Sequence, residues 1–290
     1  MTEILFDLSG KIDQQKIEAL SLLKKVADSL SIPFFVVGAS ARDFILEHCY
    51  NIRSPRMTQD IDLGVEVAGW EDFNKLSESL LSTGGFFASR ARHRFQFGSV
   101  LIDIIPFGPI EDERGRISWP PEHEIVMSIG GFSEAFRNSV TLRLSSSPEL
   151  KIKVPTLPGL ALMKIISWKD NYLERRRDAE DLLFVMQNYG EADNYDRLYD
   201  HEQDLLKEEN FETQVACIRL LGRDMAMIAD PDTLGTVRAI LDEETAEHSR
   251  YKLVIGMVGS TPDSNDRFEI VLFQVKKLRQ GINEVRCDQR

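Results

Sequence analysis

Three aspartates interrupt apolar stretches of this 290-residue sequence in a pattern that could bind a metal ion. Asp60 and Asp62 lie two residues apart in TQDIDLGVEV (58–67), so on a strand both side chains project from the same face. Asp103 is the only polar residue in the apolar run VLIDII. Carboxylates near a core repel one another and need a compensating cation, so we expect all three on neighbouring strands around a divalent ion.

The chemistry of these aspartates suits a hard divalent cation. Oxygen ligands with no histidine or cysteine nearby favour Mg²⁺ or Mn²⁺ over zinc. Two such ions about 4 Å apart are the usual arrangement for in-line phosphoryl or nucleotidyl transfer. An Asp-x-Asp pair alone more often belongs to a turn or a surface, so the metal hypothesis depends on the apolar setting and on the third aspartate.

A glycine turn upstream could hold phosphate. In VVGASARD a strand-like segment ends at Gly38, and Ser40 opens a helix-like segment. Glycine lets a phosphate approach the backbone, and a helix start offers free N–H groups. We therefore expect Gly38, Ser40 and Arg42 to bind nucleotide phosphates. Ser40 could equally cap the helix, and Arg42 could pair with Asp43 or lie on the surface.

These residues need a sheet to bring them together. Apolar residues at three- and four-residue intervals predict helices, and continuous or alternating apolar runs bounded by turn residues predict strands. Their order indicates an α+β fold with one central sheet. The predicted helices cover 14–30, 39–49 and 70–85, and the predicted strands cover 32–38, the segment with Asp60 and Asp62, and a hairpin over 92–108 that turns near Gly98.

The second half of the chain is predicted to be mainly helical. A hairpin is expected over 139–155, with its turn at SSSP, and helical periodicity dominates after it. We therefore expect a first domain of residues 1–155, which carries the aspartates, and a mainly helical C-terminal domain of residues 156–290. The segment 253–268 breaks the helical pattern. The predicted helices of this part cover 159–171, 175–190, 211–229 and 232–244.

The composition is that of an ordinary soluble globular protein. The chain has 35 basic and 47 acidic side chains, a net charge of −12 and 42% hydrophobic residues. This charge argues against a protein that coats nucleic acid over its whole surface, but it leaves room for a local basic groove. The three cysteines form no CxxC pair and the N-terminus has no signal-peptide pattern, so we expect a cytoplasmic protein without a membrane anchor.

The motifs together resemble the DNA polymerase beta-like nucleotidyltransferase superfamily. VVGAS, DIDL and LIDII follow the order of its glycine motif, its paired carboxylates and its distant third carboxylate. GASARD, TQDIDL and the later helices LPGLALMKIISWKDNYLERRRDAEDLLFVM are most similar to the AbiEii-type branch. The resemblance covers roughly residues 30 to 190. It implies a mixed-sheet nucleotidyltransferase domain, which binds metal and NTP, followed by a helical domain.

The resemblance also implies an activity and the residues that perform it. The activity is Mg²⁺-dependent (or Mn²⁺-dependent) transfer of a nucleoside monophosphate from an NTP to an acceptor hydroxyl, with Asp60, Asp62 and Asp103 as metal ligands. Lys164 is implied as the lysine that binds nucleotide phosphate and Asp178 as the carboxylate of the last motif, with Asp181 in support. A lysine that only extends along its helix to reach solvent, and ordinary helical salt bridges, are the alternatives for this cluster.

The sequence alone does not decide the binding partners or exclude two alternative functions. The resemblance suggests a bacterial toxin with an antitoxin partner and an RNA or tRNA end as acceptor, and protein hydroxyls and small antibiotics are further candidate acceptors. Arg90, Arg92 and Arg94 could guide phosphates of the triphosphate or acceptor, or form a solvated edge strand. Two rival functions use the same residues: a non-catalytic nucleotide- or partner-binding protein, and a metal-dependent phosphohydrolase.

Overall fold

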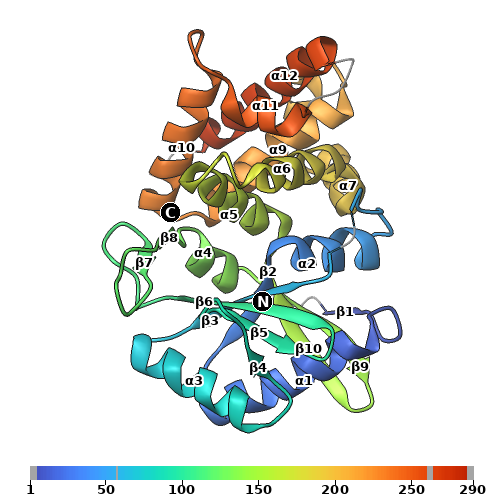
Figure 1. The fold of residues 1–290 in the computed structure, drawn as a ribbon. Coiled ribbons are helices and arrows are strands. Elements are labelled where there is room, and N and C mark those ends of the chain that lie inside the picture. Colours follow the sequence, from blue (N-terminus) through green and yellow to red (C-terminus); the bar gives the residue numbers. More distant parts are fainter. Residues whose placement is uncertain (1–4, 57, 260–263, 286–290) are drawn as a thin grey trace. The chain divides into compact units, whose positions relative to one another are not determined.

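The computed structural model describes residues 5–56, 58–259 and 264–285. It divides the chain into two units, Met1–Thr156 and Leu157–Arg290. The first unit mixes strands and helices, whereas the described residues of the second form helices only (Figure 1). The fold is α+β with a mixed sheet, as expected. Among the described helices, none is both long and apolar enough to cross a membrane.

A five-stranded mixed sheet lies at the centre of the first unit (Figure 1). Its strand order is β2-β3-β6-β5-β4, in which β3 and β6 are parallel and the other three pairs are antiparallel. The two strands that carry the aspartates are therefore hydrogen-bonded neighbours, as predicted. The strands are β2 (Phe34–Val37), β3 (Ile61–Glu66), β4 (Phe87–Ala88), β5 (Arg94–Phe97) and β6 (Val100–Phe107).

Side-chain alternation on β3 separates an apolar face from a polar one. Ile61 and Leu63 are fully buried, whereas Asp62 between them projects to the other side and keeps partial exposure. Two amphipathic helices, α1 (Gln14–Ser29) and α3 (Trp70–Ser82), pack against each other beside this sheet (Figure 1). Their buried leucines and alanines are the ones that the helical periodicity predicts.

A second sheet and an aromatic cluster complete the first unit. The second sheet has the order β1-β9-β10, with β1 parallel to β9, and a separate two-stranded ribbon pairs β7 with β8. Phe35, Phe107, Phe132 and Phe136 pack ring against ring, with centroids 5.3 to 6.0 Å apart. The elements are β1 (Leu5–Asp7), β7 (Arg116–Ser118), β8 (Val126–Ser128), α4 (Phe132–Arg137), β9 (Val140–Ser146) and β10 (Glu149–Val154).

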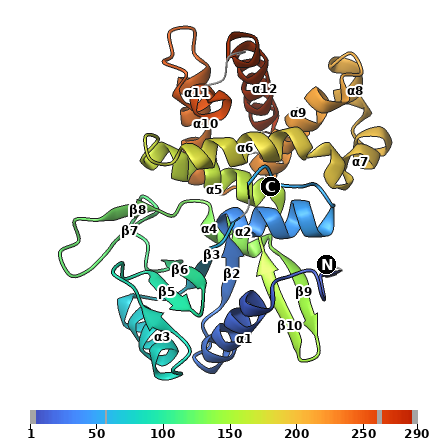
Figure 2. The same cartoon turned by 45° about the vertical axis from the view of Figure 1, so that its right-hand side comes forward.

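The second unit is built around the helix pair α9 and α12 (Figure 2). These helices approach backbone to backbone, because a Cβ at Gly222 would overlap the carbonyl oxygen of Leu278, and a Cβ at Gly281 would overlap that of Arg219. The helices are α5 (Leu157–Asp170), α6 (Arg176–Asn188), the π-helical turn η2 (Gly190–Asn194), α7 (Tyr195–Asp200), α8 (Gln203–Glu208), α9 (Thr213–Ile228), α10 (Pro231–Thr245), α11 (Lys252–Val258) and α12 (Ser264–Glu284).

The observed elements differ from the predicted ones where segments are short or irregular. The predicted hairpins over 92–108 and 139–155 are present. The helix predicted over 39–49 is instead α2 (Gly38–Asp43) followed by the π-helical turn η1 (Phe44–Cys49), a distinction that apolar spacing does not reveal. Segment 253–268 contains most of α11 and the start of α12, and its residues 260–263 lie outside the described part. Strands such as β1 and β7 span three residues, too few to show a period.

Candidate active site

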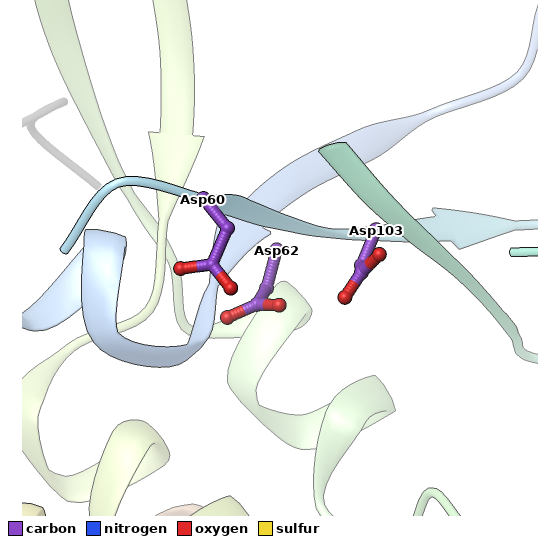
Figure 3. A group of neighbouring side chains, drawn as sticks. All are labelled: Asp60, Asp62 and Asp103. Atoms are coloured by element: carbon purple, nitrogen blue, oxygen red, sulfur yellow. The ribbon is translucent and has the colours of Figure 1, made fainter. Parts of the chain in front are cut away.

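The three predicted aspartates converge at the centre of the mixed sheet. Asp62 on β3 lies directly opposite Asp103 on β6, and Asp60 immediately precedes β3. One carboxylate oxygen from each residue lies within 4.8 Å of the others, and Figure 3 shows the three side chains projecting to the same side of the strands. Asp103 is only 8% exposed, and Asp60 and Asp62 are half-buried. The predicted adjacency is thus confirmed.

Gly38 makes room for this carboxylate group. It begins α2 directly after β2, whose last residue, Val37, pairs with Asp62. Its φ is +64°, a region that favours glycine, and a Cβ at this position would overlap the carboxylate of Asp62. The glycine is therefore required both by the turn and by the closeness of its backbone to the acidic group.

Ser40 and Arg42 hold the turn in place through buried contacts. Ser40 is 2% exposed, and its hydroxyl donates a 2.6 Å hydrogen bond to the backbone oxygen of Asp60. Arg42 is fully buried and donates to Asp43 through Nε (2.9 Å) and Nη2 (2.6 Å). The Arg42–Asp43 pair considered in the sequence analysis is therefore present within α2, and the Ser40 hydroxyl connects α2 to the residue that precedes β3.

Arg94, named in the sequence analysis only as a candidate for binding phosphates, is the partner of Asp103, a pairing that the sequence analysis did not predict. Its Nε and Nη2 donate to the two oxygens of Asp103 at 2.7 and 2.6 Å. These hydrogen bonds, with the charge of Asp103, raise the pKa of Arg94 above its usual value. A sequence signal existed: a two-residue turn at Gly98 and Ser99 pairs Phe97 with Val100, and counting back along both strands places Arg94 opposite Asp103.

The donor set fits a hard divalent cation. Its ligands are carboxylate oxygens only, and Arg94 neutralises just one of the three charges. A carboxylate offers about four lone-pair positions, so the two hydrogen bonds from Arg94 still leave Asp103 able to accept a further partner. Partly buried carboxylates this close together repel one another, and a cation bound between them would relieve this repulsion.

A second ionic cluster lies in the second unit, between α5 and α6. Lys164 is 7% exposed, and its Nζ lies 2.6 Å from Asp178 and 2.8 Å from Asp181. Burial lowers the pKa of Lys164, but the two aspartates outweigh burial and raise it above its usual value. Ser167 donates to Asp178 at 2.8 Å. The lysine is therefore a buried cation held between two carboxylates, and not a side chain that reaches solvent.

Comparison with known proteins identifies a family. A family model described as "Nucleotidyl transferase AbiEii toxin, Type IV TA system" matches residues 21–272. No curated protein matches the chain.

Several solved structures show limited similarity. They include the antibiotic-resistance factor ANT(2'')-Ia in solution, at 12% identity over 69% of this chain and 98% of that one, with a TM-score of 0.36. A CCA-adding enzyme with ATP aligns at 15% identity over 90% of this chain and 67% of that one, with a TM-score of 0.34. The Thermotoga maritima CCA-adding enzyme complexed with tRNA aligns at 14% identity, over 95% and 82%, with a TM-score of 0.31.

Proposed function

We propose that this chain, which belongs to the AbiEii nucleotidyl transferase family, transfers a nucleoside monophosphate from an NTP to an acceptor hydroxyl and releases pyrophosphate. The observation that carries the proposal is the convergence of Asp60, Asp62 and Asp103 beside the turn at Gly38. A carboxylate cluster of this kind, next to a glycine that admits close approach to the backbone, suits a metal–triphosphate complex.

Asp60, Asp62 and Asp103 would hold Mg²⁺ or Mn²⁺. A divalent cation bound there would neutralise charge on the triphosphate and favour loss of the hydroxyl proton. In the reaction, the acceptor oxygen forms a bond to the α-phosphorus while the bond from that phosphorus to the bridging oxygen breaks. The electrons of the broken bond leave with pyrophosphate, and Asp103 takes the hydroxyl proton.

The turn from Gly38 to Ser40 is where we place the terminal phosphates of the NTP. Because the Ser40 hydroxyl donates to Asp60, its contact to phosphate would use the backbone N–H, while the side chain fixes the position of Asp60. Arg42, paired with Asp43, would stabilise α2 and so the turn. Its contribution to phosphate binding is then a positioning role.

We propose, as the family resemblance implies, that Lys164 of the second unit counters the charge that develops on the triphosphate. Its raised pKa keeps the ammonium group protonated at neutral pH, and Asp178 and Asp181 fix its direction. Asp178 would be the functional carboxylate of this motif, since it also accepts a hydrogen bond from Ser167.

An RNA end, such as that of a tRNA, is the acceptor that we propose, and growth arrest of a bacterial cell is the proposed consequence. The family's description as a toxin of a toxin–antitoxin system supports this role and an antitoxin partner, and the bacterial cytoplasm is the compartment that holds all three. Induced expression tests the toxin role: growth should stop with the wild-type chain and continue with the Asp60→Asn, Asp62→Asn variant.

The activity itself is tested by incubating the chain with α-labelled NTPs, Mg²⁺ and a cell extract. Label should move to a macromolecule, with release of pyrophosphate, and the Asp60→Asn, Asp62→Asn variant should lose transfer. Asp112→Asn, an exposed carboxylate on the same unit, is the matched control and should keep it. Free phosphate in place of pyrophosphate would indicate a phosphohydrolase, and tight NTP binding without either product would indicate a non-catalytic nucleotide-binding protein.

A further inference from the structure

A pocket of about 240 Å³ lies next to the acidic group and has no part in the roles assigned above. Its lining residues belong to α3, to the segment from β4 to β5 and to the residues just after β7. Arg94 lines this pocket and also binds Asp103, so one residue connects the pocket with the aspartates. The lining that matters here consists of Trp70, Phe73, Trp119, Arg90, Arg92 and Arg94.

The aromatic wall of the pocket is already assembled. Trp70 packs against Phe73 at 5.8 Å and against Trp119 at 5.1 Å between ring centroids. Trp70 keeps partial exposure, and the buried indole N–H of Trp119 has no hydrogen-bond partner among the residues that the structure describes. Partly exposed tryptophan rings are stacking surfaces for nucleobases and show little preference among bases.

Two arginines at the rim of the pocket carry positive charges that no acidic side chain in the described part of the chain neutralises. Arg90 and Arg92 are exposed, and neither forms an ion pair or hydrogen bond with any other residue in the described part of the chain. Arg94, by contrast, is bound to Asp103. In a chain of net charge −12, two unpaired arginines beside an aromatic wall favour an anionic ligand and disfavour a polycationic small molecule.

The position of the pocket along the strand order indicates that it lies on the side of the acceptor and not on the side of the NTP. Because the strand order is β2-β3-β6-β5-β4, the Gly38 turn lies on the β2 side of the aspartates and the pocket lies on the β5 side. In-line transfer requires the attacking hydroxyl to enter opposite the departing pyrophosphate. With the terminal phosphates at Gly38, the hydroxyl therefore enters from the side of Asp103 and Arg94.

We propose that this pocket binds the terminal nucleotides of a single-stranded RNA acceptor. A base stacks on Trp70, and Arg90 and Arg92 bind the phosphates, which leaves the terminal hydroxyl directed past Arg94 toward Asp103. The role of the pocket as an acceptor site rests on the proposed nucleotidyl transfer. The binding of RNA to these residues does not depend on that transfer, so RNA binding and transfer are measured in separate experiments.

RNA binding is tested by fluorescence anisotropy with a 5′-fluorescein octaribonucleotide, without NTP, on the full chain. Arg90→Glu with Arg92→Glu should weaken binding by about tenfold or more and reduce the slope of log K against log salt by about 1.4, the value for two contacts on a single strand. Trp70→Leu should weaken binding by severalfold and leave the slope unchanged. Lys25→Glu with Lys75→Glu makes the same charge change at exposed helix positions and should leave affinity within about twofold.

Thermal unfolding of each variant shows whether it is folded, and a folded Arg90→Glu, Arg92→Glu variant with wild-type RNA affinity would overturn the proposal. So would undiminished transfer of label by that variant to a protein in the extract, since the acceptor would then be of another class. If the wild-type chain releases no pyrophosphate but the arginine variant still loses RNA binding, the RNA site stands and the proposed transfer fails.

Discussion

Replacement of Arg94 tests how the positive charge beside Asp103 affects metal binding. Arg94→Met keeps most of the apolar stem but removes the guanidinium group that donates at 2.7 and 2.6 Å to both carboxylate oxygens. A dication bound to Asp103 is repelled by this group and competes with it for the same oxygens. We therefore expect the variant to bind Mn²⁺ more tightly than the wild-type chain does.

The expected change in Mn²⁺ affinity depends on how exposed the Arg94 side chain is to solvent. Hydrogen bonds to charged groups contribute about 1.5 to 3 kcal/mol when they are well shielded. The Arg94 side chain is 36% exposed, so solvent screening reduces the net value to about 1 kcal/mol. This free energy corresponds to a dissociation constant for Mn²⁺ about fivefold lower.

Isothermal titration with Mn²⁺, in the absence of nucleotide, measures the effect. Lys75→Met removes one positive charge from an exposed position on α3 and should leave the dissociation constant nearly unchanged. Weaker Mn²⁺ binding by Arg94→Met would refute the reasoning, because it would mean that Arg94 orients Asp103 as a ligand more than it competes with the ion.

Three further perturbations have defined outcomes. Gly38→Ala forces a Cβ into the Asp62 carboxylate at a positive φ, so we expect a loss of about 2 kcal/mol or more in urea unfolding, together with weaker Mn²⁺ binding. Lys164→Met removes the cation that lies 2.6 Å from Asp178 and 2.8 Å from the buried Asp181 and should lower the free energy of unfolding by about 3 kcal/mol or more, part of which neutral replacements of both aspartates should restore. Burial raises the pKa of Cys49 to about 11 and of Cys217 to about 12, so iodoacetamide should label both thiols much faster in urea than in the folded chain. Because the unfolded thiols ionise first, stability should also fall as the pH rises above about 8.5, as urea unfolding at several pH values would show.

The sequence was sufficient to predict that the three aspartates lie together, because local rules specify their arrangement. Two aspartates at alternate strand positions must share a face, and a third in a fully apolar run needs a partner of opposite charge or a shared ion, so their convergence could be expected. The sequence also indicated a strand that ends at Gly38 before a helix, whereas the positive φ of Gly38 and the closeness of its backbone to Asp62 depend on how β2 and β3 pair.

The sequence did not predict which distant strands pair or which partners the polar side chains bind. No periodicity indicates that β1 joins β9, far along the chain, or that the Ser40 hydroxyl binds the backbone of Asp60. The three arginines of the β4–β5 region looked equivalent in sequence, yet Arg94 binds Asp103 whereas Arg90 and Arg92 border the pocket. The arginines differ because of the register in which β5 pairs with β6. This register can be counted back from the turn at Gly98 only if the turn is known to contain two residues.

Two different strand pairings of this chain position the aspartates and Arg94. The aspartates are fixed by the pairing of β3 with β6, whereas the orientation of Arg94 depends on the length of the turn at Gly98 and Ser99. One residue inserted into that turn would reverse the faces of β5 and carry Arg94 away from Asp103, with β3 and β6 left intact. The carboxylate group and the position of Arg94, which lines the proposed acceptor pocket, therefore depend on separate strand pairings, so a change in the β5–β6 turn can alter the pocket without moving the aspartates.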